Sequence, residues 1–275
     1  MSTGWGQPPQ CVVRAGEPSG AVPVPAAVAS LAGDGEVTPV WENELGGLTF
    51  ALAGGRFVKW TPHASGIDLG REVARLRWAA PYAAVPRVLD HGADDAGSWL
   101  VTAGLPGDNA VSRRWLADPA RAVTAIGVGL RALHDALPVP ECPFSWSVPD
   151  RLADIRQRAG AGLLDPARWS PEHQHLDIAG ALELLADPPP MDRLVVCHGD
   201  ACAPNTLLTD DGSWSGHVDL GSLGTADRWA DLTIATWSTT WNYGLGWEQP
   251  LLAAYGVDPD PDRTRYYRLL WDLGP

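Results

Sequence analysis

The segment His198-Gly199-Asp200 is followed five residues later by Asn205 and then by Asp219-Leu220-Gly221. Two carboxylates and one amide supply hard oxygen ligands that suit Mg²⁺, together with an acceptor that can orient a hydroxyl group. Transfer of a phosphoryl group requires mainly this kind of positioning, along with neutralisation of the phosphate charge. The residue types and their spacing therefore predict an enzyme that transfers phosphoryl groups.

Short apolar segments flank this motif and predict how its parts meet. Residues 194–197 are expected to form a buried strand that leads into the motif. Residues 206–208 and 215–218 lie on either side of a turn and are expected to form a hairpin. Because a hairpin brings its two ends together, Asn205 and Asp219 are predicted to share one metal ion.

The first third of the chain contains the only lysine of the sequence, Lys59, in a predicted hairpin of residues 48–52 and 56–60. Where arginine is used at every other basic position, a lysine indicates a place that needs a compact ammonium group. Glu72 follows 13 residues later, in the first turns of a helix that Asp68 is expected to cap. The pair predicts a carboxylate that holds the ammonium group on nucleotide phosphates.

Residues 43–47 contain Gly46 and Gly47 and are interpreted either as an ordinary hairpin turn or as a turn whose amides approach phosphate. The sequence has no G-x-x-x-x-G-K-[ST] motif, which excludes the P-loop kinases. Apolar residues recur every three or four positions in residues 123–137 and 152–163, which predicts helices there.

A stretch rich in Gly and Pro follows the predicted strand of residues 98–102 and indicates a lobe boundary. The first lobe is expected to bind the nucleotide, and its first 35 or so residues to be partly loop or short helix. The second is expected to carry the motif loop and the acceptor site. The predicted parts are an N-lobe of residues 1–102, a hinge of residues 103–107 and a C-lobe of residues 108–275.

Composition restricts the partners. The 275 residues are 45% hydrophobic and carry a net charge of −13, with no cluster of basic residues, which argues against binding to nucleic acid. No run of 18 apolar residues and no export signal is present, so neither a membrane segment nor secretion is expected. The four cysteines lack zinc-site spacing, which favours reduced thiols in a cytoplasmic protein.

Several irregular segments, in the same order along the chain, resemble the aminoglycoside 3'-phosphotransferases, a family of antibiotic kinases. The resemblance covers roughly residues 40–275 and implies an α+β, bilobal, protein-kinase-like fold. A small β-rich N-lobe would have one helix, and a larger C-lobe would be helical. The matching segments are residues 198–205, 218–231, Cys142-Pro143-Phe144, residues 151–165 and Tyr267-Arg268-Leu269-Leu270.

The resemblance implies transfer from ATP or GTP to a hydroxyl of a small molecule, with the 3'-hydroxyl of an aminoglycoside as the best candidate and antibiotic resistance as the outcome. Asp200 would be the catalytic residue, and Asn205 and Asp219 would bind Mg²⁺. Lys59 would hold phosphates and Glu72 would hold Lys59. His198 and Asp231 would be structural, and the hinge backbone, with Thr102 and Gly104, would contact the nucleotide.

The acceptor side departs from the family pattern at four places. The chain has Ser222 after the D-x-G motif in place of arginine, Ser170-Pro171 in place of two acidic residues, Trp237-Ser238 in place of Arg-Asp, and an end without the family's Asp-Glu-Phe-Phe. Candidates for substrate contacts are Glu172, Asp227, Arg228, Asp272 and Pro275 with its terminal carboxylate.

Four tryptophans occur in the segments expected around the acceptor: Trp237, Trp241, Trp247 and Trp271. Their rings suit either stacking on sugars and ammonium groups or packing in the core. The expected acceptor is a small cationic or hydroxylated molecule, and the expected oligomeric state is a monomer or a homodimer.

Two other functions stay open. The chain could phosphorylate another hydroxylated metabolite or antibiotic, or it could be a catalytically silent nucleotide-binding module. The complete set of motif residues speaks against the silent module. A protein kinase fits least, because residues 220–230 leave no room for a long activation loop between Asp219 and Asp231.

Overall fold

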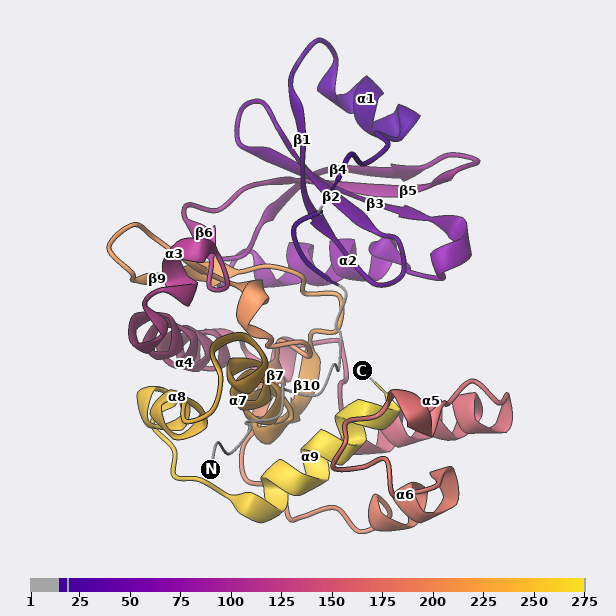
Figure 1. Cartoon of the computed structure of the whole chain (residues 1–275), viewed down its shortest axis with the longest axis vertical. Coiled ribbons are helices and arrows are strands. Elements are labelled where there is room, and N and C mark those ends of the chain that lie inside the picture. Colours follow the sequence, from indigo (N-terminus) through magenta and orange to yellow (C-terminus); the bar gives the residue numbers. More distant parts are fainter. Residues whose placement is uncertain (1–14, 19, 275) are drawn as a thin grey trace, which may run out of the picture.

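The structure is a computed structural model that describes residues 15–18 and 20–274. A smaller part built on one antiparallel sheet lies on a larger, mainly helical part (Figure 1). This arrangement confirms the predicted α+β fold with a β-rich N-lobe and a helical C-lobe.

The five strands of the N-lobe sheet run in the order β1-β2-β3-β5-β4. Their bounds are β1 (Val37–Glu42), β2 (Leu48–Leu52), β3 (Arg56–Pro62), β4 (Arg87–Ala93) and β5 (Gly97–Ala103). Two α-helices accompany the sheet where one was predicted: α1 (Ala26–Ala32) and α2 (Leu69–Ala79), with the short 3-10 helix η1 (His63–Ser65) between β3 and α2.

Side-chain alternation along the strands places the two helices on opposite faces of this sheet. Phe50 and Val58 point to the face covered by α1, where they form a small core with Val28. Lys59, the next residue along β3, therefore points to the other face, toward α2. Asp68 caps α2, as predicted, by accepting from the Gly70 amide at 2.9 Å.

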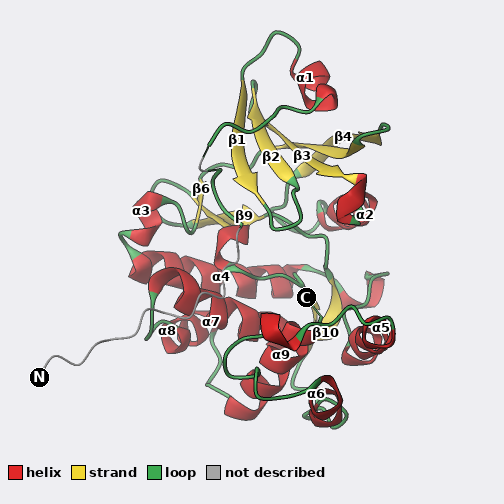
Figure 2. Ribbon diagram, turned by 45° about the vertical axis from the view of Figure 1, so that its right-hand side comes forward, coloured by secondary structure: helices red, strands yellow, loops and turns green. Residues whose placement is uncertain are grey.

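The C-lobe is built from helices and two small sheets (Figure 2). Its helices are α3 (Arg113–Leu116), α4 (Pro119–Ala136), α5 (Val148–Gly160), α6 (Ile178–Leu184), α7 (Trp229–Tyr243), α8 (Glu248–Tyr255) and α9 (Pro261–Leu273), with the 3-10 helices η2 (Val139–Glu141), η3 (Pro166–Arg168) and η4 (Ala203–Asn205). One sheet pairs β7 (Leu194–Cys197) with β10 (Gly224–Asp227), and the other has the order β6 (Asp108–Asn109), β8 (Thr206–Leu208), β9 (Trp214–His217).

The predicted hairpin after the motif is β8 and β9, and the predicted strand before the motif is β7. The sequence reasoning missed β4, β6 and β10. Cys142, Cys197 and Cys202 are free thiols, as expected, whereas Cys11 lies outside the described residues. Among the described helices, none combines the length and the apolar character that crossing a membrane requires.

Candidate active site

Residues 198–205, here called the motif loop, connect β7 to β8, and Asp231 of α7 fixes the start of this loop. The Asp231 carboxylate accepts hydrogen bonds from the amides of His198, at 2.6 Å, and Gly199, at 2.9 Å. Gly199 has φ +85°, and a Cβ there would lie 2.2 Å from the Ser222 carbonyl oxygen. Only glycine can therefore bring the loop this close to residues 219–223.

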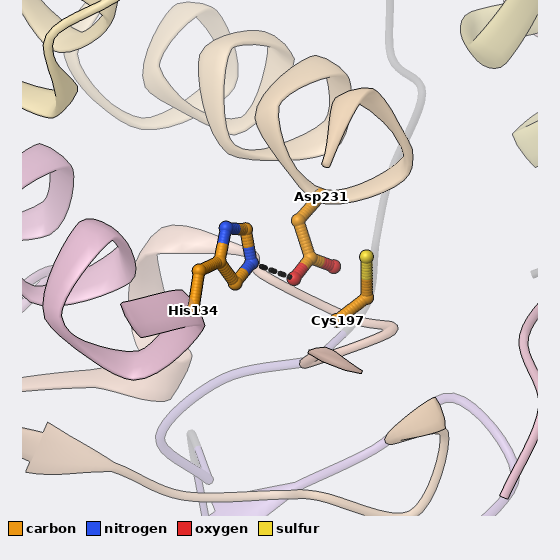
Figure 3. A group of neighbouring side chains, drawn as sticks. All are labelled: His134, Cys197 and Asp231. Atoms are coloured by element: carbon orange, nitrogen blue, oxygen red, sulfur yellow. Dashed lines mark hydrogen bonds and ion pairs between the residues drawn. The ribbon is translucent and has the colours of Figure 1, made fainter. Parts of the chain in front are cut away.

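Asp231 belongs to a buried cluster with His134 and Cys197 (Figure 3). Their potential ligand atoms lie within 4.8 Å of one another, which is compatible in spacing with a metal ion. However, His134 Nε2 donates to Asp231 at 2.9 Å and His134 Nδ1 bonds the Tyr255 hydroxyl at 2.8 Å. The backbone amides of the motif loop donate the remaining hydrogen bonds to the Asp231 carboxylate. We interpret the cluster as a hydrogen-bonded brace, because its polar atoms already have partners.

We expect Asp231→Asn to lower the free energy of unfolding by about 3 kcal/mol, because its amide group would direct a donor at amides that are themselves donors. The corresponding decrease in Tm is about 6–12 °C for a chain of this size. Asp262→Asn serves as the control, since the Asp262 side chain on α9 is 85% exposed. Thermal unfolding followed by circular dichroism measures both, and equal Tm values would contradict the bracing role.

The same comparison has a defined pH dependence. Burial opposes ionisation of Asp231, but the hydrogen bond and charge of His134 outweigh it and lower the pKa of this carboxyl group. The stabilisation from ionised Asp231 is therefore present above the ordinary pKa of about 3.9 and disappears as the pH falls through the lower folded-state pKa. The difference in Tm between wild type and Asp231→Asn should shrink over that acidic range.

His198 links the two halves of the motif through both ring nitrogens. Its Nδ1 accepts from the Asp200 amide at 3.2 Å, so Nε2 carries the proton and donates to the Val218 carbonyl at 2.9 Å. This arrangement uses a neutral ring and leaves neither nitrogen for chemistry. His198 thus holds the segments of Asp200 and Asp219 at a fixed separation.

Asp200 and Asn205 contact each other across the motif loop. The Asn205 side-chain nitrogen donates to the Asp200 carbonyl at 2.9 Å and to Asp200 Oδ2 at 3.1 Å. Asp200 Oδ1 is buried and has no hydrogen-bond partner among the described residues. Burial and the nearby Asp219 charge raise the pKa of Asp200. A carboxylate oxygen without a donor is left to accept a hydrogen bond from a ligand.

Lys59 extends from the N-lobe into a carboxylate pair. Its Nζ lies 2.8 Å from Glu72 Oε1 and 2.9 Å from Asp219 Oδ1. Burial alone would lower the pKa of Lys59, but the two carboxylates raise it above its ordinary value. Partial desolvation likewise opposes ionisation of Asp219, whose side chain is 49% exposed, yet Lys59 lowers the pKa of that carboxyl group. The structure therefore joins the lysine, the helix carboxylate and the motif, as the sequence predicted.

Asp219 has φ +64°, the one positive φ among the described non-glycine residues. A residue with a side chain is strained when its backbone adopts the left-handed region, and such strain is typical of functional sites. The Asp219 side chain remains 49% exposed, and its Oδ1 pairs with Lys59. The left-handed backbone thus presents a half-exposed carboxylate beside Lys59.

The donor set fits a hard divalent cation. Because the nitrogen of the Asn205 amide donates to Asp200, the amide oxygen is left for another partner. Asp219 Oδ2 supplies an anionic oxygen on the other side of the β8–β9 hairpin, whose ends pair between the Val218 amide and the Asn205 carbonyl at 3.0 Å. An amide oxygen and a carboxylate are ligands that Mg²⁺ accepts beside phosphate oxygens.

We expect Lys59→Met to raise the nucleotide KM roughly 10- to 100-fold, because it removes a charge-assisted contact while keeping an apolar stem of similar length. The acceptor KM should change much less. Arg71→Met removes an exposed cation adjacent to Glu72 and is the matched control. Steady-state kinetics with each substrate varied in turn measures the effect; a larger change in the acceptor KM would move Lys59 out of the nucleotide site.

Thr102 lies in the strand that was predicted for residues 98–102, and Gly104 lies in the predicted hinge, just beyond the end of β5. Thr102 lies within β5 and pairs with Phe57 and Val88. The Gly104 amide donates to the Gly55 carbonyl at 2.7 Å, which extends the ladder between β3 and β5. The Gly104 amide is therefore not free for a nucleotide, and its carbonyl is the group left for that contact.

The acceptor candidates at the start of α7 are corrected by the structure. Asp227 pairs with Leu194 at the end of the β7–β10 sheet opposite the motif loop. Its carboxylate accepts from the amides of Asp192 and Trp229. Arg228 pairs with the Asp192 carboxylate at 2.7 Å. Both side chains therefore have protein partners at this junction, at the end of the short sheet that lies away from the motif loop.

Asp272 also has protein partners in place of a substrate. Its carboxylate accepts from the amide and hydroxyl of Ser170, and it lies 2.5 Å from His173 Nδ1. This contact joins α9 to the segment before α6. Glu172 in that segment is exposed, and Pro275 lies outside the described residues. Of the predicted substrate residues, Glu172 alone stays a candidate on the described surface.

Sequence reasoning missed two contributors. Ser238 Oγ accepts from the backbone amide of Ala203 in the motif loop at 2.9 Å. The side-chain nitrogen of Asn242 donates to the same oxygen at 3.1 Å. His134 completes the brace around Asp231 from α4. Neither residue belongs to the motif. Ser238 contacts a residue 35 positions away and His134 one 97 positions away, and a single serine or histidine in a helical pattern does not indicate such contacts.

Comparisons with known proteins identify the family of the chain. A model of the phosphotransferase enzyme family matches residues 47–267. The aminoglycoside 3'-phosphotransferase of Streptomyces fradiae is 34% identical over 255 residues, 83% of this chain and 91% of the relative. The streptomycin 3''-kinase of Streptomyces griseus is 35% identical over 262 residues, 86% of this chain and 95% of the relative.

A solved structure of aminoglycoside phosphotransferase APH(3'')-Id from Streptomyces rimosus superposes with a TM-score of 0.73 at 30% identity, covering 90% of this chain and 95% of that chain. An aminoglycoside-3'-phosphotransferase of type VIII gives a TM-score of 0.74 at 28% identity, covering 90% and 96%. The family and the enzyme class predicted from the motifs are confirmed. The chain belongs to the phosphotransferase enzyme family, among the aminoglycoside phosphotransferases.

Proposed function

We propose that this protein transfers the γ-phosphoryl group of a nucleoside triphosphate to a hydroxyl group of an aminoglycoside and so inactivates the antibiotic. One observation carries the proposal: Lys59 and Glu72 of the N-lobe meet Asp219, which shares the motif with Asp200 and Asn205. A relative of 30% identity has been solved as a complex with ADP and streptomycin.

In the proposed reaction the acceptor hydroxyl donates to Asp200 Oδ1, the buried oxygen that has no protein partner among the described residues. The hydroxyl oxygen bonds to the γ-phosphorus as the bond from that phosphorus to the bridging β–γ oxygen breaks, and the hydroxyl proton passes to Asp200. In a loose transition state the proton is lost late, so orientation by Asp200 matters more than its basicity.

The remaining residues act on the donor. Lys59, held by Glu72, binds the α and β phosphates and neutralises charge that would otherwise oppose transfer. Asn205 and Asp219 would hold Mg²⁺, which supplies charge neutralisation on the β and γ phosphates when bound. The raised pKa of Lys59 keeps its ammonium group charged across the physiological range.

Two acceptor positions are candidates. The 3'-hydroxyl of an aminoglycoside is favoured by relatives such as the Streptomyces fradiae enzyme. The streptomycin 3''-kinase favours the 3''-hydroxyl of streptomycin, because it matches a larger share of this chain. Ser170, Pro171 and Ser238 stand where the family pattern has acidic residues. Their loss removes charge-assisted contacts to the ammonium groups of the acceptor, so other contacts must supply part of its recognition.

The test is incubation of the purified chain with Mg²⁺, ATP or GTP, and a panel containing kanamycin, neomycin and streptomycin. Mass spectrometry should show a gain of one phosphate on at least one drug, and NMR should place it on the 3'- or 3''-hydroxyl. Absence of transfer to every aminoglycoside, with transfer to another hydroxylated compound, would favour the metabolite-kinase alternative. Nucleotide binding without transfer to any acceptor would favour the silent module.

The cellular setting follows from this chemistry. We propose a cytoplasmic location, where nucleoside triphosphate is available, and a monomer or homodimer as the active form. The net charge of −13 suits a cationic acceptor and opposes nucleic acid.

A further inference from the structure

The four tryptophans expected around the acceptor have different environments in the structure. Trp237 is 7% exposed and belongs to the core. Trp247 and Trp271 are half-buried and pack against that core. Trp241 is 39% exposed, although its ring lies 5.2 Å from that of Trp237. The cluster is thus a core packing feature with one member on the surface.

Helix geometry places Trp241 between two known neighbours of α7. Ser238 faces the motif loop, since its hydroxyl accepts from the Ala203 amide. Trp237 faces α9 and the segment before α6, where Arg268 and His173 contact its ring. With about 100° between successive residues, Trp241 projects between the directions of Trp237 and Ser238. Its exposed ring therefore lies between the motif loop and the C-terminal helix.

The ring of Trp237, the inner member of this aromatic pair, contacts a cation of the protein. The Arg268 guanidinium lies 5.1 Å from the centre of the Trp237 ring, and Glu248 holds Arg268 from α8 at 2.7 Å. Within the part of the chain that the structure describes, no arginine or lysine lies over the Trp241 ring. A protein cation thus covers the inner indole, and the outer indole presents a face that another cation can occupy.

We propose that Trp241 is an acceptor-binding residue whose indole face receives an ammonium-bearing sugar ring of the acceptor. The inference rests on the proposed function. Tryptophan has the most favourable ring for a cation, and a preformed pair with Trp237 fixes the ring without further loss of side-chain freedom. This contact supplies recognition in a region where the family's acidic side chains are replaced by Ser170, Pro171 and Ser238.

The test compares three substitutions of Trp241 in the full chain. Trp241→Leu keeps apolar volume against Trp237 but has no ring, whereas Trp241→Phe keeps a ring. We expect Trp241→Ala and Trp241→Leu to raise the KM of the aminoglycoside roughly 10-fold, and Trp241→Phe to raise it less than about 3-fold. The nucleotide KM should stay within about 2-fold of wild type, because Lys59 and Glu72 belong to the N-lobe whereas Trp241 lies on α7 of the C-lobe.

The chain offers a matched control. Tyr82 is also 39% exposed and pairs with Trp78, one helical turn earlier, at 5.5 Å with a similar tilt. Tyr82→Ala removes the exposed member of an equivalent aromatic pair near the end of α2 and should leave the acceptor KM unchanged. Thermal unfolding of each variant verifies that the fold is intact, and Trp241→Leu carries the test if Trp241→Ala does not fold.

Direct binding separates this inference from the function on which it rests. Isothermal titration of kanamycin or streptomycin into the nucleotide-free protein should show weaker binding to Trp241→Leu than to wild type. If wild type phosphorylates an aminoglycoside but Trp241→Leu has an unchanged acceptor KM and affinity, the role of Trp241 is overturned alone. An equal loss in Trp241→Phe and Trp241→Leu would also overturn it, since the ring would not matter. A wild type without transfer to any aminoglycoside overturns both proposals.

Discussion

Asp200→Ala should lower kcat on the order of 10³-fold while the nucleotide KM stays within about 3-fold of wild type. The reason lies in the geometry of the motif loop. Asp200 Oδ1 is buried without a partner among the described residues, and Oδ2 is engaged by Asn205 at 3.1 Å. The substitution removes the group that orients the hydroxyl but leaves Lys59 and Glu72 in place.

Single-turnover and steady-state kinetics with the preferred aminoglycoside measure this effect. Asp200→Asn is the companion variant, because it retains the volume and presents a donor where the hydroxyl also donates; it should be impaired to a similar degree. Asp210→Ala, whose side chain is 99% exposed on the β8–β9 hairpin, is the control with no expected loss. Activity of Asp200→Ala near the wild-type level would show that the assigned role is wrong.

The second large effect is expected from Asp219→Asn, which should remove most of the dependence of nucleotide affinity on Mg²⁺. In the proposed site Asp219 supplies an anionic ligand, and Lys59 lowers the pKa of this carboxyl group against its partial desolvation. Loss of one charged ligand should weaken binding of Mg²⁺-ADP on the order of 10²-fold. Without Mg²⁺, ADP should bind at least as well as to wild type, because one carboxylate no longer repels the phosphates.

Asparagine is the informative substitution because position 219 has φ +64°, and asparagine tolerates the left-handed region about as well as aspartate does. Alanine would add a backbone cost that is unrelated to the metal. Isothermal titration of ADP in MgCl₂ and in EDTA measures the effect, with Asp210→Asn as the control. Equal Mg²⁺ dependence in wild type and Asp219→Asn would exclude Asp219 as a ligand.

The nucleotide half of the site could be predicted from the sequence because short segments position it. The β2–β3 hairpin places Lys59, the capped start of α2 places Glu72, and the β8–β9 hairpin joins Asn205 to the segment of Asp219. Each element has a local pattern of turns, caps or alternating side chains. The ion pair between Lys59 and Glu72 then follows, because Lys59 points to the face of the sheet that α2 covers.

The acceptor half could not be predicted in the same way, because contacts between distant segments decide it. Asp272 was expected to face the substrate, but His173 and Ser170, about 100 positions away, take its carboxylate. Asp227 was likewise expected to contact the substrate, but its carboxylate accepts from the amides of Asp192 and Trp229. Pairings of this kind depend on the tertiary fold, and neither spacing nor periodicity reports them.

The contact between Lys59 and Asp219, 2.9 Å apart across the two lobes, has a consequence for how the substrates load. Because Asp219 pairs with Lys59, an incoming nucleotide competes with this carboxylate for the ammonium group. A free triphosphate that displaces Asp219 from Lys59 would be repelled by the charge of this carboxylate. A triphosphate bound to a divalent cation would be repelled less, because the cation would neutralise the Asp219 charge. We therefore expect the Lys59–Asp219 ion pair to favour binding of the metal-complexed nucleotide over the free nucleotide. Higher salt screens the half-exposed Asp219 and should reduce this difference in affinity.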